Sequence, residues 1–145
     1  MLNLSRYHIL AIGKLRKLWI KEGLSIYLKR LPGLAITELR ESNPQQEAKV
    51  IHNTVKKNEL LITLSEEGEA LSSLAFAERL QKLGNERLVF VIGGADGLSP
   101  EVKDSSAWSL SLSPLTFPHE IARLLLVEQL YRAQTILQQG PYHRF

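Results

Sequence analysis

The chain has 145 residues, of which 44% are hydrophobic and 23% charged, proportions typical of one globular domain rather than a disordered or fibrous chain. It has no cysteine, which excludes disulfides, thiolate metal sites and cysteine nucleophiles. The net charge of +3 moderately favours a phosphate-rich partner, although a basic run is more typical of a solvated surface. Basic residues gather at Lys14, Arg16, Lys17, Lys21, Lys29 and Arg30.

No segment of the sequence has the length and apolar character of a membrane span. The most apolar stretch, residues 121–130, is short and contains Arg123 and Glu128. The first 13 residues lack the basic, apolar and small order of a signal peptide. We therefore expect a cytoplasmic protein that binds neither a membrane nor a metal ion.

The first half of the chain alternates apolar runs with amphipathic stretches, which predicts strands and helices in turn. Residues 7–12, 34–39 and 59–64 are predicted strands, and residues 15–31 and 44–57 are predicted helices. Pro32-Gly33 ends the first helix, and Asn43 caps the second, which has Pro44 in its first turn.

The second half continues the alternation. The predicted elements are a helix from Ser72 or Ser73 to Gly84, strands at 88–92 and 108–112, a short helix capped by Ser99, and a helix at 119–138. The continuously apolar strand at 88–92 is typical of a parallel sheet buried on both faces. The order predicts an α/β fold with helices on both faces of a parallel sheet. The last helix has too many apolar residues for one face, so it packs either inside a monomer core or also against a second subunit.

Three loops lie at the carboxyl ends of predicted strands, where such sheets bind ligands. They follow Leu64, span Gly93 to Gly97, and span Ser113 to Pro118. The glycine-rich loop lacks the spacing of a dinucleotide or phosphate loop, so a plain tight turn explains it equally well. Two prolines stiffen the third loop, which suits main-chain recognition of an adenine edge or simply a rigid connector.

The segment 140–145 contains side chains that suit RNA. Tyr142 can stack on a base, Arg144 can hold a phosphate, and His143 can donate a hydrogen bond or move a proton. A frayed chain end is the simpler interpretation of the composition alone.

Seven segments together resemble the RlmH family, the pseudouridine N3-methyltransferases of 23S rRNA. They are residues 93–99, 108–111, 115–119, 123–133 and 141–144, with 12–14 and 27–32 in the first half. Each motif is weak alone, but their order and spacing are specific and cover nearly the whole chain. One departure is Ala95-Asp96, where many relatives have Pro-Glu, so that the acid is kept but shortened.

The resemblance implies a SPOUT fold, in which the C-terminal segment threads a trefoil knot, and a homodimer that binds S-adenosylmethionine within that knot. By family analogy, main-chain groups at Leu64, Gly94, Ser113, Pro114, Leu115, Thr116, Phe117 and Pro118 contact the cofactor. The implied substrate is a pseudouridine of 23S rRNA in the large subunit or the assembled ribosome.

The implied reaction brings N3 of the base in line with an activated methyl group, and positioning of this kind can supply ~7–11 kcal/mol of the barrier. N3 must lose its proton, and His143 is the candidate to accept that proton or to orient the base. Arg144 would hold a phosphate or base carbonyl, and Tyr142 would stack or pack beside it. If the family geometry holds, the tail of one subunit completes the site of the other.

Other functions also fit parts of the sequence. A SPOUT enzyme for another RNA, such as a tRNA ribose methyltransferase, is one, although the Pro141 to Arg144 tail favours the rRNA enzyme. A non-catalytic ribosome-binding factor with the same fold is a second. A nucleotide-binding α/β protein that uses Gly93 to Gly97 is a third.

Overall fold

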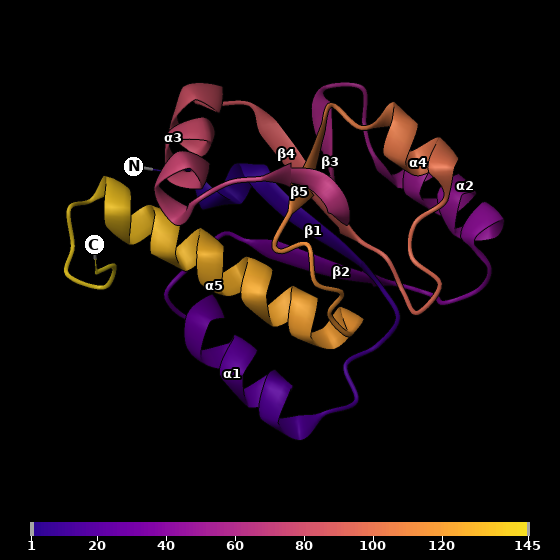
Figure 1. Ribbon diagram of the computed structural model, residues 1–145, viewed down its shortest axis with the longest axis horizontal. Coiled ribbons are helices and arrows are strands. Elements are labelled where there is room, and N and C mark those ends of the chain that lie inside the picture. The colour runs from indigo at the N-terminus through magenta and orange to yellow at the C-terminus, as the bar shows by residue number, and fades with distance from the viewer. Residues whose placement is uncertain (1, 145) are drawn as a thin grey trace.

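Five parallel strands form one sheet in the computed structural model, which describes residues 2–144. The strands are β1 (Tyr7–Ile12), β2 (Ala35–Leu39), β3 (Glu59–Ala70), β4 (Arg87–Ile92) and β5 (Trp108–Ser111), in the order β2-β1-β4-β3-β5. Every neighbouring pair is parallel. The predicted α/β class with a parallel sheet is therefore confirmed (Figure 1).

Helices connect the strands, as the alternation predicts. They are α1 (Leu18–Leu28), α2 (Pro44–Thr54), α3 (Ser73–Leu83), α4 (Pro100–Ser105) and α5 (His119–Leu137), and a 3-10 turn, η1 (Leu4–Arg6), precedes β1. Asn43, Ser72 and Ser99 cap α2, α3 and α4, and each side chain accepts a hydrogen bond from an amide three residues later. No helix among residues 2–144 is long and apolar enough to cross a membrane.

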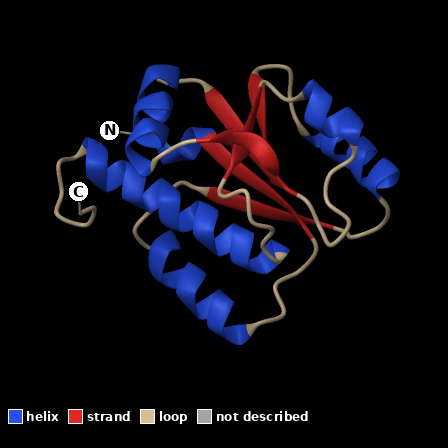
Figure 2. Ribbon diagram, viewed as in Figure 1, coloured by secondary structure: helices blue, strands red, loops and turns tan. Residues whose placement is uncertain are grey.

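The helices cover both faces of the sheet (Figures 1 and 2). One core contains Phe90 of β4 with buried residues of α1, α3 and α5, and the other contains Val89 and Val91 with buried residues of α2 and α4. Because successive side chains of a strand point to opposite faces, β4 is buried on both sides. This explains why residues 88–92 are continuously apolar.

Helices α1 and α5 lie side by side and run in the same direction (Figure 1). Near their first turns, the backbone N–H groups just before α1 donate to Glu120. Further along, Gly23 lies against Leu124, and Tyr27 packs on Tyr131 at a ring-centroid distance of 5.7 Å. One end of this pair therefore lies at the start of both helices, and the other end at their carboxyl termini.

Helix α1 is shorter than the predicted helix over 15–31. It begins at Leu18 because the preceding N–H groups donate to carboxylates of Glu38 and Glu120 instead of entering a helix. It ends at Leu28, after which single turns carry the chain to the buried Leu31. Helix α2 also ends before the predicted Lys57, at Thr54.

Strand β3 is longer than the predicted strand over 59–64, because it pairs with β5 a second time. Leu64 and Glu69 both pair with Leu110, so residues 65–68 form a bulge. A Cβ atom at Gly68 would lie 2.7 Å from the carbonyl oxygen of Ser109, so only glycine permits this approach. The bulge places Ser65 and Glu66 beside the ends of the neighbouring strands.

Helix α5 ends in a turn that reverses the chain. The N–H of Gly140 donates to the carbonyl of Thr135, and that of Gln139 donates to Ile136. Gln139 has a φ of 59°, the left-handed conformation usual at this position of a Schellman motif. The residues that follow therefore run back along α5.

Candidate active site

A cleft of about 710 Å³ opens at the carboxyl ends of β3, β4 and β5. All three predicted loops line it. The lining residues are Leu64 to Glu66, Ile92 to Leu98, Lys103, Leu112, Ser113, Leu115 to His119, and Ala122. Every residue predicted to contact a cofactor is among them except Pro114, which is exposed and does not line the cleft.

The glycine-rich loop is a tight turn pressed against its neighbours. The N–H of Gly97 donates to the carbonyl of Gly94 at 3.0 Å, and Gly97 has a φ of 72°. A Cβ atom at Gly93 would lie 2.8 Å from the carbonyl carbon of Gly97, and one at Gly94 would lie 3.1 Å from Ile12. These positions therefore present main chain rather than side chains to the cleft.

The loop after β5 forms the opposite wall. The Ser113 hydroxyl accepts a hydrogen bond from the N–H of Leu115 at 3.1 Å, which fixes the loop together with its two prolines. His119, at the start of α5, lines the cleft, and its Nδ1 atom is buried without a hydrogen-bond partner within residues 2–144. A polar atom in this state can bond a ligand.

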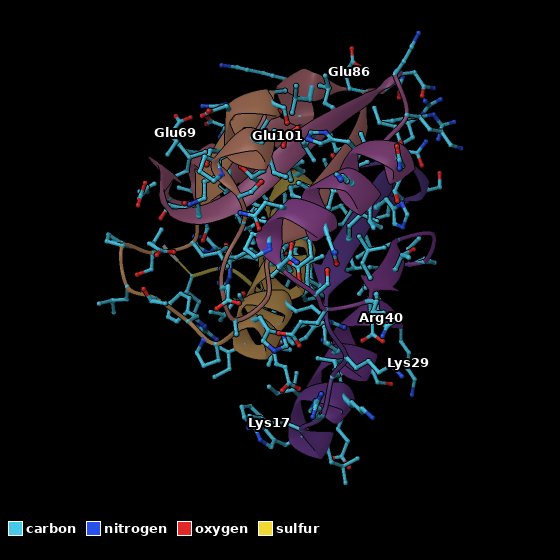
Figure 3. All side chains as sticks on the ribbon, turned by 90° about the vertical axis from the view of Figure 1, so that its right-hand side faces the viewer. Lys17, Lys29, Arg40, Glu69, Glu86 and Glu101 are labelled. Carbon is cyan, nitrogen blue, oxygen red and sulfur yellow. The ribbon has the colours of Figure 1, made fainter. Side chains whose placement is uncertain are left out.

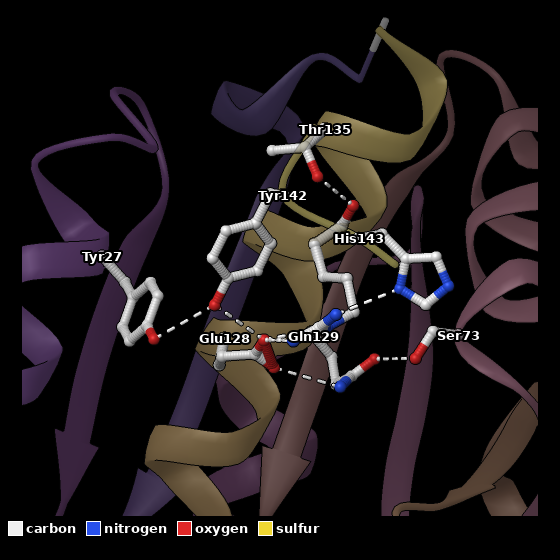
Figure 4. Close-up of polar contacts among 8 residues, drawn as sticks. Tyr27, Ser73, Glu128, Gln129, Thr135, Tyr142 and His143 are labelled. Carbon is white, nitrogen blue, oxygen red and sulfur yellow. Dashed lines mark hydrogen bonds and ion pairs between the residues drawn. The ribbon is translucent and has the colours of Figure 1, made fainter. Parts of the chain in front are cut away.

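The predicted tail residues lie on the last turns of α5 (Figure 4). The Tyr142 hydroxyl donates to Glu128 at 3.1 Å, so the Tyr27 hydroxyl, 3.2 Å away, donates to it in turn. The Tyr142 ring meets the Tyr131 ring edge-on, with centroids 4.8 Å apart. Burial, the hydrogen bond with Tyr27 and the charge of Glu128 raise the pKa of the Tyr142 phenol, which holds it protonated.

Arg132 links the other tail residues to the same helix. Its guanidinium bonds Glu128 at 2.9 and 2.7 Å, lies 4.8 Å from the centre of the Tyr142 ring, and is 3.0 Å from Nδ1 of His143. Because arginine only donates, Nδ1 of His143 accepts, and the hydrogen of a neutral ring is on Nε2. Arg144 is exposed.

The cleft and the tail lie at opposite ends of α5. His119 lines the cleft, whereas Tyr142 and His143 contact Glu128 and Arg132. From His119 to Arg132 the helix rises about 20 Å, at about 1.5 Å per residue. The structure therefore brings Tyr142 and His143 together, and brings the loop residues together, but does not join the two groups within one chain.

Sequence reasoning missed several residues at both places. At the cleft these are Lys103 and His119. At the tail, Glu128 and Arg132 have the i, i+4 spacing of a helical ion pair, which is a readable signal. Tyr27 offers none, because 115 residues separate it from Tyr142.

Comparison with known proteins identifies the family. A family model described as a predicted SPOUT methyltransferase matches residues 5–143. The chain belongs to the SPOUT methyltransferases.

Relatives of this SPOUT methyltransferase confirm the resemblance to the RlmH family. It is 65% identical over 144 residues to the ribosomal RNA large subunit methyltransferase H of Prochlorococcus marinus (strain MIT 9211), with 99% of each chain covered. It is 59% identical over 143 residues to the enzyme of the same name from Synechococcus sp. (strain CC9311), again with 99% of each covered.

Solved structures show that the SPOUT methyltransferase has the fold of its family. A probable methylase family protein from Haemophilus influenzae Rd KW20 matches with a TM-score of 0.62 and 15% identity, covering 99% of this chain and 72% of that one. The SpoU methyltransferase AviRb from Streptomyces viridochromogenes, solved in complex with the cofactor AdoMet, matches with a TM-score of 0.51 and 11% identity. That alignment covers 92% of this chain and 58% of AviRb.

Proposed function

We propose that this SPOUT methyltransferase transfers a methyl group from S-adenosylmethionine to N3 of a pseudouridine in the 23S rRNA of the large ribosomal subunit. The observation that carries the proposal is the match along 99% of the chain to relatives named ribosomal RNA large subunit methyltransferase H. The N3 and pseudouridine specificity rests on the family resemblance of the tail. Since the substrate is ribosomal, we expect the protein in the cytoplasm.

The cleft has the features that this cofactor needs. Its walls are the main chain of Gly94 and its neighbours, the Leu64 end of β3, and the stiff loop from Ser113 to Pro118. A side chain at Gly94 would press against Ile12, so the position keeps main-chain groups accessible. When bound, the cofactor supplies a methyl group already activated on a sulfonium. The residues of the chain then have to bind it, orient the base and exclude water.

The tail geometry supports different roles for its residues. His143 accepts a hydrogen bond from Arg132 through Nδ1, which favours an orienting role in which Nε2–H donates to a base carbonyl. Tyr142 is held by Glu128 and Tyr27, which favours packing that supports His143. Arg144 is exposed and suits a phosphate or a base carbonyl.

A homodimer is part of the proposal, because a cleft and a tail about 20 Å apart on one helix cannot act on the same base. On α1, next to α5, Leu18, Trp19 and Ile26 are 68%, 58% and 54% exposed, and Trp19 and Ile26 share a face. A two-fold axis that packs the α1 and α5 pairs antiparallel would bring each tail to the partner's cleft. The trefoil knot also belongs to this proposal, and the family match supports it.

The direct test is methyl transfer from labelled S-adenosylmethionine to ribosomes that lack the modification, with free 23S rRNA alongside. We expect label on the large-subunit pseudouridine and a sharp loss with His143→Ala. His52→Ala on α2 is the matched control, since it removes a histidine outside both the cleft and the tail. Cofactor binding without label on either RNA would indicate another RNA target, and no cofactor binding would favour a non-catalytic ribosome-binding factor.

The shared site has its own test. A variant truncated after Gly140 and a cofactor-loop variant, Gly94→Val, should each be inactive, and mixed subunits should regain part of the activity. Absence of rescue in heterodimers verified by differential tagging would contradict a site completed by the partner.

A further inference from the structure

The segment that joins β1 to α1, residues 13–17, is an exposed basic loop with an ordered backbone. Lys14, Arg16 and Lys17 are all exposed. The backbone N–H groups of Arg16 and Lys17 donate to one oxygen of Glu120, at 2.7 and 3.0 Å. Glu120 is itself buried, so a charged group of α5 is used to fix this backbone.

A second buried charge holds the beginning of the basic loop. Arg123, whose side chain is 2% exposed, donates to the carbonyl of Gly13 at 3.1 Å and to Glu38 at 2.7 Å. Glu38 accepts in addition from the N–H of Leu15 at 3.2 Å. The acids and the arginine around the basic loop therefore bind its backbone and one another.

The basic side chains themselves have no acidic partner. Across residues 2–144, no ion pair involves Lys14, Arg16 or Lys17. The first turn of α1 has no acidic residue either, so the partial positive charge of the helix start adds to theirs. A loop with fixed backbone and unneutralised cations is preorganised for an anion, because little ordering cost remains on binding.

The basic loop lies beside the cleft. A Cβ atom at Gly13 would lie 3.5 Å from the ring of His119, which lines the cleft. Lys17 marks the far edge of the basic loop, at the start of α1 (Figure 3). The cations therefore surround one side of the cleft opening and not the opposite end of α5.

We propose that the basic loop binds the phosphodiester backbone of the RNA substrate beside the cleft, and that Glu120 and Arg123 are positioning residues that fix its shape. The inference rests on the proposed function for the identity of the RNA. Contacts to phosphate set the position of a nucleic acid on a protein without reading its sequence. Here they would hold the RNA strand so that the target base reaches the cleft.

The first test removes the charges. The variant Lys14→Gln/Arg16→Gln/Lys17→Gln is compared with Lys49→Gln/Lys56→Gln/Lys57→Gln, which removes three exposed cations on α2 and just after it. Binding to large subunits is measured against salt concentration, and affinity for S-adenosylmethionine is measured in parallel. In the loop variant we expect the salt slope to fall by about 1 per lost phosphate contact and the KM for the RNA substrate to rise roughly tenfold.

The cofactor affinity of both variants should stay unchanged, and the control should bind RNA like the wild type. Equal binding by the two triple variants would overturn the proposal. If the wild type methylates no ribosomal substrate, the proposed function fails, but the salt slopes for large-subunit binding still decide the role of the basic loop.

The second test separates shape from charge. Glu120→Gln removes a negative charge but keeps an oxygen that can accept from Arg16 and Lys17, whereas Glu120→Ala also removes the acceptor. A purely electrostatic surface predicts that both variants bind RNA more tightly. A positioned loop predicts that Glu120→Ala binds several-fold more weakly than Glu120→Gln, with thermal midpoints confirming that both fold. Equal or tighter binding by Glu120→Ala would overturn the positioning role, and if Glu120→Ala fails to fold, Arg123→Lys takes its place in the same comparison.

Discussion

The pair formed by Arg123 and Glu38 is asymmetric, and its two substitutions should differ in cost for that reason. The arginine side chain is 2% exposed and the glutamate side chain 39%. Arg123→Met leaves a carboxylate that water can solvate, so we expect a loss of about 2 kcal/mol, from the hydrogen bond to buried Gly13 and a weak ion pair. Glu38→Gln leaves a buried charge without its counterion, which costs about 3 kcal/mol.

The double variant decides whether this reasoning holds. Once Arg123 is methionine, Glu38→Gln has little left to disturb, so the double variant should cost about 2 kcal/mol rather than the sum of about 5. The assay is urea unfolding at pH 7 and one fixed protein concentration, with thermal midpoints as a check. A change of 1 kcal/mol corresponds to roughly 2–4 °C for a chain of this size. Additive losses, or a Glu38→Gln variant as stable as wild type, would refute the argument.

The same pair gives a pH dependence. The hydrogen bond from Arg123 lowers the pKa of Glu38 below its ordinary value of 4.5. A lowered pKa in the folded state contributes stability above the unfolded value, and that contribution is lost as pH falls through the folded pKa. The unfolding free energy should therefore decrease below about pH 4.5, and decrease less steeply in Arg123→Met. Glu120, whose pKa is lowered by the N–H of Lys17, keeps its share in the variant, so the slope should not vanish.

Two further substitutions test packing. Gly68→Ala should destabilise the protein by about 1–3 kcal/mol, because the new methyl group would meet the Ser109 carbonyl, and a crystal structure of a variant with wild-type stability would have to show β5 displaced. Tyr7→Phe should leave stability unchanged or raise it, because the buried hydroxyl has no partner within residues 2–144 and burial raises its pKa to about 12; chemical denaturation showing a loss above about 1 kcal/mol would mean that the hydroxyl is bonded.

The parts of the fold predicted from sequence are those whose causes are local. The continuous apolar run of β4 and the caps at Asn43 and Ser99 each depend on a few neighbouring residues. Because the carboxyl ends of parallel strands share one edge of the sheet, the three loops of the cleft also followed from the order of elements.

The rest depended on contacts between distant residues. The start of α1 is set by Glu120, more than 100 residues away, and the second pairing of β3 is set by β5. The acidic run after Leu64 shows no alternation that would mark it as a strand. The tail appeared as a set of RNA-binding side chains, but its attachment to Glu128 and Tyr27 required the three-dimensional structure.

The position of β4 in the sheet has a consequence for synthesis of the chain. β4 lies between β1 and β3, and these two strands do not pair with each other. A nascent chain that has emerged only as far as Ala70 therefore holds a β1-β2 pair and a separate β3, with no strand to join them. The sheet becomes continuous only when Ile92 has emerged, and the cleft is complete only when Ala122 has followed. Folding of this chain is consequently a late event, governed by long-range pairings that form slowly.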